Sequence, residues 1–196
     1  SILISITAAP AWAMLPNGPN PELVGALVRE IILRYPGRAF AFELFPGANT
    51  LRGWGAPPDP AAYAALLHSV RASLSDLNSD LTLVAAGLAA NASPTPAGDM
   101  NDLEYLQRLY AAGAADTMPI ISIRLPAVQS DLLAIPAPGQ PVVLRHYELV
   151  RQVMLNAGHA SGLVWITGFS WPAGDASSHE QRLQQALWLE QAYALL

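Results

Sequence analysis

The chain has 196 residues, of which 52% are apolar and only 13% are charged, and its formal net charge at pH 7 is −5. About a quarter of the residues in soluble domains are usually charged, so much of this chain must be buried, either in its own core or against partners. The ten basic residues are all arginines and are scattered along the sequence, which argues against nucleic-acid binding. No cysteine is present, which excludes disulfides and thiolate metal sites.

The amino-terminal stretch "SILISITAAPAW" has no basic segment and does not begin with Met. It therefore predicts a buried strand rather than a signal peptide, and we expect the sequence to begin within a longer protein. No apolar run in the chain approaches the roughly 18 to 20 residues that a membrane-spanning helix requires. We treat residues 1–196 as a single domain, a natural length for one core.

Apolar, strand-like runs alternate with amphipathic, helix-like runs five times, which is the pattern of βα units in a parallel sheet. The predicted strands are 2–9, 39–45, 81–90, 119–125 and 162–169. Most of them are continuously apolar rather than alternating. This pattern is expected either when helices cover both faces of an open sheet or when one face fills a barrel.

Helices are predicted over 20–35, 59–74, 100–113, 141–158 and 177–196. Their starts carry capping signals: Asn20 and Asp59 each precede a proline, and Ser178 precedes Gln181 by three residues. Glycines at 113 and 158 are typical helix-ending residues. The longest Pro- and Gly-rich connections follow strands and precede helices, and in parallel sheets binding sites are built at that end.

Two strand ends resemble motifs of one enzyme superfamily. "FELFPGAN", Phe42 to Asn49, resembles the Phe-Glu-Ile-Trp-Asn-Glu-Pro-Asn strand end of retaining (β/α)8 glycosidases related to cellulases and β-xylosidases. "WITGFSW", Trp165 to Trp171, resembles their Trp-Ile-Thr-Glu-Phe-Gly-Trp. The family's catalytic glutamates close its fourth and seventh strands, whereas here the motifs fall on the second and fifth. The resemblance therefore implies an α/β fold of the (β/α)8 TIM-barrel type, incomplete, with about five βα units that correspond to family strands three to seven.

The same resemblance places Gly47 at the acid/base position and Gly168 at the nucleophile position. Retaining hydrolysis needs two carboxyl groups about 5 to 5.5 Å apart, and glycine supplies neither. Glu43 is a weak substitute, because alternation along the strand points it to the same side as Gly47. The expectation that we prefer is a buried structural carboxylate paired with an arginine such as Arg124.

Candidate saccharide contacts are Trp12, Asn49, Trp54, Arg124 and Trp171, since aromatic faces at the ends of strands could stack on sugar rings. The alternative for the tryptophans is packing between loops, because aromatic rings bury large areas whatever the function. Trp165 and Trp188 are assigned to packing. Asp99 and Asp175 lie in loops at the same end, where short polar residues mostly form turns.

We expect a catalytically inactive, glycosidase-like barrel that serves as a structural or binding subunit of a larger extracytoplasmic assembly, a location implied by the resemblance alone. The alternatives are a divergent glycoside hydrolase with displaced carboxylates and a non-catalytic carbohydrate-binding protein. No cofactor and no metal is expected, because the four histidines have no metal-ligand spacing and no phosphate-binding motif is present. The expected partner is additional polypeptide that completes the barrel or covers its edges, joined under the carbohydrate-binding alternative by a saccharide.

Overall fold

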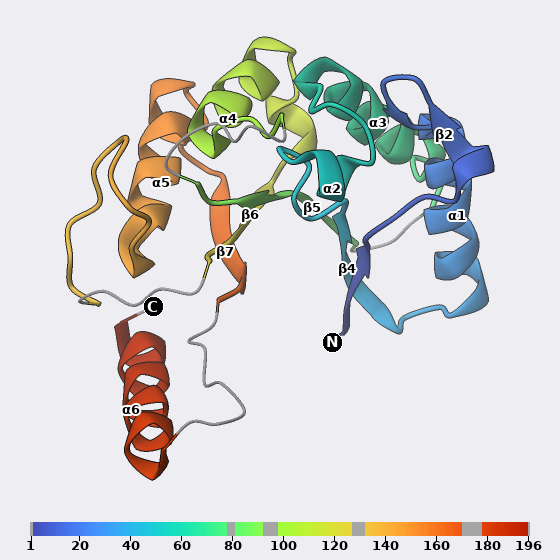
Figure 1. Ribbon diagram of the computed structural model, residues 1–196. Helices are drawn as coiled ribbons and strands as arrows, with labels where there is room; N and C mark the ends of the chain where they lie inside the picture. Colours follow the sequence, from blue (N-terminus) through green and yellow to red (C-terminus); the bar gives the residue numbers. More distant parts are fainter. Residues whose placement is uncertain (1, 78–80, 92–97, 127–131, 170–177, 196) are drawn as a thin grey trace.

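The computed structural model describes residues 2–77, 81–91, 98–126, 132–169 and 178–195 (Figure 1). Within them, one parallel sheet has the strand order β1-β4-β5-β6-β7. Its strands are Ile2–Ile6 (β1), Ala39–Leu44 (β4), Thr82–Ala89 (β5), Ile120–Arg124 (β6) and Leu163–Gly168 (β7). Each strand pairs in parallel with the next strand of this sheet along the chain, as consecutive βα units commonly do. The five predicted strands and their parallel arrangement are confirmed.

The helices follow the strands in the expected alternation. They are α1 (Pro21–Arg34), α2 (Leu51–Trp54), α3 (Pro60–Ser73), α4 (Asp102–Ala111), α5 (Tyr147–Asn156) and α6 (His179–Leu195). The Asn20 and Asp59 side chains each accept two backbone N–H bonds from the first turn of α1 or α3. At the start of α6, the Ser178 hydroxyl accepts from the Gln181 N–H and the Gln181 side chain accepts from the Ser178 N–H, so all three predicted caps are confirmed.

Three details differ from the expectation. A small hairpin, Met14–Leu15 (β2) with Gly18–Pro19 (β3), and the short helix α2 occupy stretches predicted as loops. The helix predicted over 141–158 begins only at Tyr147, after a 3-10 turn, Leu144–His146 (η3). Two further 3-10 turns are Ala11–Ala13 (η1) and Ala115–Thr117 (η2).

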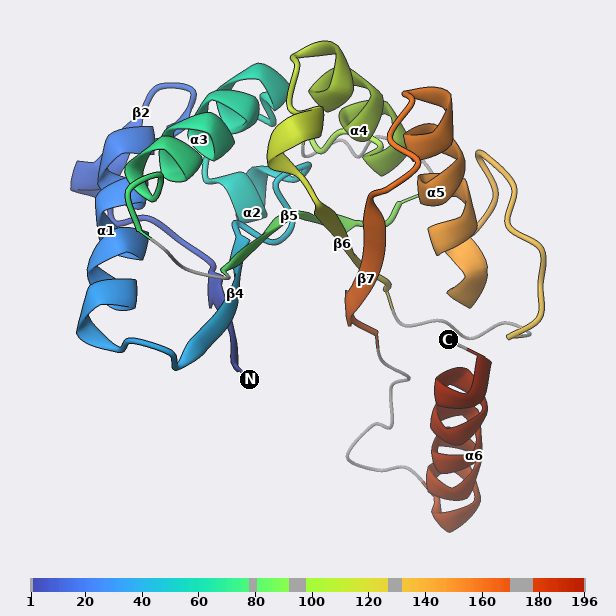
Figure 2. The ribbon, with the colours of Figure 1, turned by 180° about the vertical axis from the view of Figure 1, so that it is seen from behind.

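Helices α1, α3, α4 and α5 lie along one side of the sheet, and α6 lies apart from them in both views (Figures 1 and 2). The main core lies between these helices and alternate strand residues such as Phe42, Leu44, Ile121 and Ile123. The opposite face carries a small buried cluster, Ala41, Val84 and Ile120, against which Trp165 packs. Within the described residues, helices cover one face of the sheet and the other carries only this small cluster, which fits the second of the two arrangements left open, in which one face fills a barrel.

The edge strands β1 and β7 have no neighbour on their outer sides within the described residues. Large apolar side chains on them are open to solvent, including Ile2 at 54% and Leu163 at 56% exposure. Exposed edges of this kind are normally covered in native proteins. No helix in the described part of the chain is long and apolar enough to cross a membrane.

Candidate functional site at the carboxyl ends of the strands

Glu43 on β4 is the buried carboxylate of the helix-free face, with 2% of its surface exposed. Its Oε2 accepts a hydrogen bond from the Ser5 hydroxyl at 2.6 Å, and its Oε1 accepts one from the Thr167 hydroxyl at 2.6 Å. Ser5 lies on the adjacent strand β1, whereas Thr167 lies on β7, which the sheet order separates from β4 by two strands. The sheet is therefore curved enough for a side chain to bridge β4 and β7 across its inner face, as in a barrel interior.

The expected pairing of Glu43 with Arg124 is not found among the described residues, and this expectation was wrong. Arg124 ends β6, and its guanidinium instead lies over Gly168, where an added Cβ would be 3.2 Å from the Arg124 Nε. Arg124 and Gly168 are paired in the β6–β7 register, and the Gly168 carbonyl accepts a hydrogen bond from the Leu125 N–H. The arginine side chain thus fills space beside the nucleophile-equivalent position.

Gly47, which the sequence resemblance places at the acid/base position, is buried in a tight turn after β4 and has a φ of +86°. Its N–H donates to the Gly87 carbonyl at 2.7 Å, and its carbonyl accepts from the Thr50 N–H and hydroxyl, both at 2.8 Å. Gly53 packs so closely on it that an added Cβ there would lie 2.3 Å from the Gly47 oxygen. The position is part of a packed turn, and a positive φ disfavours any side chain there.

The turn at Gly47 rests on an irregularity in β5, where the register shifts between Ala85 and Leu88. Ala86 has a φ of +73° and Gly87 a φ of +43°. The Tyr63 hydroxyl from α3 accepts a bond from the Ala86 N–H at 2.6 Å and donates to the Leu44 carbonyl at 2.7 Å. Burial raises the pKa of Tyr63 far above its usual value, so the phenol stays neutral and keeps both bonds. The strained β5 segment is therefore held by a buried side chain.

Asn49 is fully buried and joins two segments of backbone. Its amide nitrogen donates to the Ala89 and Met100 carbonyls, each at 3.0 Å, and its amide oxygen accepts from the Ala89 N–H at 2.8 Å. Both of its N–H donors are thus used by protein backbone, and these surroundings favour a structural role over contact with a saccharide. Nearby, Asp99 accepts a bond from the Leu51 N–H, in keeping with a turn-forming residue.

The tryptophans proposed as saccharide contacts differ in their exposure to solvent. Trp54 is 1% exposed, stacks edge-on against Phe45 and Tyr63, and donates its Nε1–H to the Asn17 carbonyl at 2.8 Å, so it belongs to the core. Trp12 lies in the turn after β1 and is 76% exposed, so its ring is open to a ligand. Trp171 and Asp175 lie outside the described residues.

Sequence reasoning missed a hollow of about 590 Å³ along β7. It is lined by Leu3, Val164, Ile166 and Thr167 and by the aromatic side chains of Tyr147, Trp165, Phe169 and Tyr193. The rings come from helices and strands far apart in the sequence, and Phe169 meets Tyr193 edge-on at 5.5 Å between ring centroids. Trp165, assigned to packing, does pack on the inner-face cluster but also borders this hollow.

A buried ionisable pair at the same end of the sheet was also missed. The His146 Nε2 lies 2.6 Å from the Asp102 Oδ2, and the two side chains are 7% and 0% exposed. Asp102 begins α4 and His146 ends the turn before α5, so the pair ties the two helices together. The described residues contain no group of three His, Asp or Glu side chains that could hold a metal ion.

No protein-family model matches the sequence, and no curated protein matches it significantly. Solved structures do match. A family 39 glycoside hydrolase from Bacteroides cellulosilyticus WH2 is similar with a TM-score of 0.63 at 18% identity, over 89% of this chain and 34% of that one. A monomeric β-xylosidase from Caulobacter crescentus CB15 is similar with a TM-score of 0.53 at 16% identity, over 87% and 38%.

A GH128 (subgroup II) endo-β-1,3-glucanase from Sorangium cellulosum is similar with a TM-score of 0.59 at 16% identity, over 98% of this chain and 63% of that one. The chain thus spans about a third of the length of the matched family 39 hydrolase and less than two thirds of the glucanase. At these identities the likeness concerns the fold. The chain therefore has the fold of part of a (β/α)8 glycoside hydrolase barrel.

Proposed function

We infer that the protein is a catalytically inactive, glycosidase-like barrel that acts as a structural or binding subunit of a larger extracytoplasmic assembly. The observation that carries this proposal is the state of the inner-face carboxylate. Glu43 is buried with both oxygens accepting bonds from hydroxyls, while the two positions that correspond to catalytic glutamates are glycines. A general acid needs an exchangeable proton within reach of the leaving oxygen. A buried carboxylate whose two oxygens both accept hydrogen bonds is poorly placed to provide one.

The proposed partner is additional polypeptide that covers β1 and β7. The support is physical: both strands are edges within the described residues, and both carry exposed apolar side chains. A parallel sheet is normally buried on both faces, and here the inner face has only a small cluster of its own. Strands added beside β1 and β7 would cover these edges and enclose Glu43 further.

Replacing Gly168 by glutamate in the full-length protein tests whether the lost nucleophile explains inactivity. The backbone there has no positive φ, and an added side chain meets the movable Arg124 side chain. With activated aryl glycosides the leaving group departs without much help from a general acid. We therefore expect no turnover by the wild type and a slow release of phenol by Gly168→Glu if the site still admits a sugar. Gly168→Gln, which has the same size but no nucleophile, is the matched control.

A second candidate, carbohydrate binding without catalysis, is favoured by the exposed Trp12 ring and by the aromatic hollow along β7. Aromatic faces bind sugar rings through their apolar sides, and such a surface needs no catalytic carboxylate. Titration of the protein with cello-, xylo- and β-1,3-gluco-oligosaccharides distinguishes carbohydrate binding from the preferred proposal. Carbohydrate binding predicts saturation that Trp12→Ala weakens and Tyr35→Ala, which removes an exposed ring far from this end of the sheet, leaves unchanged. The preferred proposal predicts no saturation with any of these sugars.

A further inference from the structure

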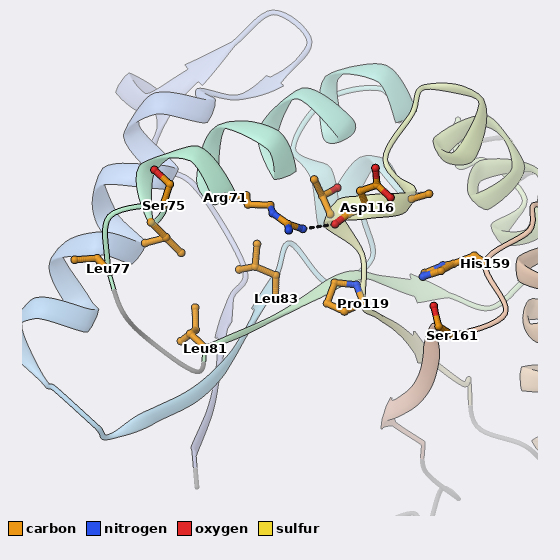
Figure 3. Close-up of a pocket in the computed structure, with 12 residues that line it drawn as sticks. Arg71, Ser75, Leu77, Leu81, Leu83, Asp116, Pro119, His159 and Ser161 are labelled. Atoms are coloured by element: carbon orange, nitrogen blue, oxygen red, sulfur yellow. Dashed lines mark hydrogen bonds between the residues drawn. The ribbon is translucent and has the colours of Figure 1, made fainter.

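A second cavity lies at the amino ends of the strands, opposite the end that carries Gly47 and Gly168. Its volume is about 600 Å³, within the range of about 300 to 1,000 Å³ that small-molecule sites occupy. Its walls come from the end of α3, the start of β5, η2 and the segment that leads into β7 (Figure 3). It is thus independent of the site described above.

The floor of this cavity is aliphatic. Leu74, Leu81, Leu83 and Pro119 line it, and none of the described lining residues is Phe, Tyr or Trp. Sugars are usually held against aromatic faces, whereas flexible hydrocarbon chains pack on leucine side chains. The lining therefore suits an aliphatic ligand better than a saccharide.

Arg71 projects across the cavity from α3 (Figure 3). Its guanidinium donates one hydrogen bond to the Asp116 backbone carbonyl, and no described carboxylate forms an ion pair with it. The Asp116 carboxylate itself points away from Leu83 and His159 in Figure 3. A guanidinium has five N–H donors in a planar fork that matches a carboxylate. Arg71 can therefore bind an acidic group while keeping its bond to the backbone.

In the view of Figure 3, His159 lies across the cavity from Arg71, with Pro119 between them and Leu83 below Arg71. Its Nδ1 is 2.8 Å from the Tyr110 hydroxyl. Burial raises the pKa of Tyr110 to about 12, so this hydroxyl keeps its proton at neutral pH and can donate it. His159 thus forms part of the polar wall opposite Arg71.

The carbonyls at the end of α3 would repel an anion if they were open to the cavity. They are instead occupied: the Arg71 carbonyl accepts from the Leu74 N–H, and the Ala72 carbonyl accepts from the Ser75 N–H and hydroxyl. Of the charged side chains on the described lining, Arg71 is the cation and Asp116 the anion, so the affinity for a negative head depends on Arg71.

We propose that this cavity binds an aliphatic monocarboxylate of medium chain length, with the carboxylate on the Arg71 guanidinium and the hydrocarbon chain on the leucine floor. This site goes beyond the proposed function and does not depend on it, because none of its residues lies at the carboxyl ends of the strands.

Hexanoate is the probe, with acetate as the ligand that keeps the charge without the chain and 1-hexanol as the ligand that keeps the chain without the charge. Isothermal titration of the full-length protein is expected to show saturable binding of hexanoate, at least about tenfold tighter than binding of either comparator, because each lacks one of the two contacts. Absence of saturation, or equal affinity for hexanoate and 1-hexanol, would overturn the proposal.

Arg71→Met keeps an unbranched apolar stem and removes the charge, and we expect it to weaken hexanoate binding by about tenfold or more, since a charge-assisted hydrogen bond is worth at least that factor. Arg108→Met is the matched control, because Arg108 is an exposed helix arginine on α4 whose partner is Glu104. Ala115→Leu, which places bulk in the cavity, should abolish binding. Equal weakening by both arginine variants, or unchanged binding in Ala115→Leu, contradicts the site.

Discussion

Two neighbouring tyrosines in the core differ in whether their buried hydroxyls have hydrogen-bond partners. Tyr63 and Tyr105 stack edge-on with 6.3 Å between ring centroids, and both are fully buried. The Tyr63 hydroxyl has a backbone donor and a backbone acceptor, whereas the Tyr105 hydroxyl has no hydrogen-bond partner among the described residues. A buried polar group without a partner costs about 1 to 3 kcal/mol.

Tyr105→Phe should therefore raise the free energy of unfolding by about 1 kcal/mol, because it removes an unsatisfied hydroxyl and keeps the ring. Tyr63→Phe is the matched control and should lower the free energy of unfolding by about 1 to 3 kcal/mol, because it leaves the Ala86 N–H and the Leu44 carbonyl without their partner. Urea denaturation of both variants measures the difference. A loss of stability in Tyr105→Phe would show that the hydroxyl has a partner after all.

The two glycines that the sequence resemblance places at catalytic positions also differ. Gly47 has a positive φ in a packed turn, whereas Gly168 lies at a strand end beside the Arg124 side chain. We expect Gly47→Ala to lower the free energy of unfolding by about 1 to 2 kcal/mol, and Gly168→Ala to change it by less than about 0.5 kcal/mol. Thermal and urea unfolding check both values. Equal tolerance at the two positions would mean that the turn can relax, and that a glutamate could be restored at 47.

At the scale of elements, two carboxylates of α4 contact basic side chains in different surroundings. Asp102, at the start of the helix, is buried against His146, whereas Glu104, two residues further on, pairs with Arg108 of the same helix in an exposed position. Exposed helix pairs contribute about 0.3 to 0.5 kcal/mol, but removal of one partner from a buried pair leaves the other without compensation.

Asp102→Ala should lower the free energy of unfolding by about 3 kcal/mol or more, since it also removes the acceptor of the Asn91 N–H bond. Glu104→Ala should lower it by about 0.5 kcal/mol or less. Equilibrium denaturation of the two variants gives the comparison, and similar small losses would mean that the Asp102–His146 contact does not hold α4 and α5 together.

The elements could be predicted from the sequence to the extent that local signals define them. Continuous apolar runs gave the five strands, and Asn20 and Asp59 marked helix starts, because strand burial and capping depend on neighbouring residues. Contacts between distant residues could not be predicted. The partners of Glu43 lie 38 and 124 residues away, and the burial of Trp54 depends on Gly18, whose missing side chain leaves room for the indole. The hairpin at Met14 likewise lacks a local signal strong enough to separate it from a loop.

At the scale of the whole molecule, the described sheet has a helix-covered outer face, a sparsely packed inner face and edges at β1 and β7 that present apolar side chains to solvent. The expected likeness to a (β/α)8 glycoside hydrolase barrel is confirmed at the level of fold. The inactive state, the assembly, the saccharide and the extracytoplasmic location remain predictions, since they depend on chemistry and partners that a fold does not specify.

Residues 1–196 expressed alone should self-associate with rising concentration, because the open edge at β7 offers unpaired backbone and apolar side chains. Leu163→Lys should reduce the association, since a charged edge residue disfavours strand pairing. Leu155→Lys changes a comparably exposed leucine on α5 and should have little effect. Light scattering coupled to size-exclusion chromatography measures the association, and equal behaviour of both variants would exclude β7 as the associating edge.

The most direct test of inactivity is the rate at which the wild-type full-length protein hydrolyses a panel of activated aryl glycosides, measured beside Glu43→Gln. The account predicts rates for both proteins that match the uncatalysed reaction, because Glu43 is buried and both candidate catalytic positions are glycines. Hydrolysis by the wild type that Glu43→Gln abolishes would contradict it, and would identify Glu43 as a working carboxylate in a divergent glycoside hydrolase.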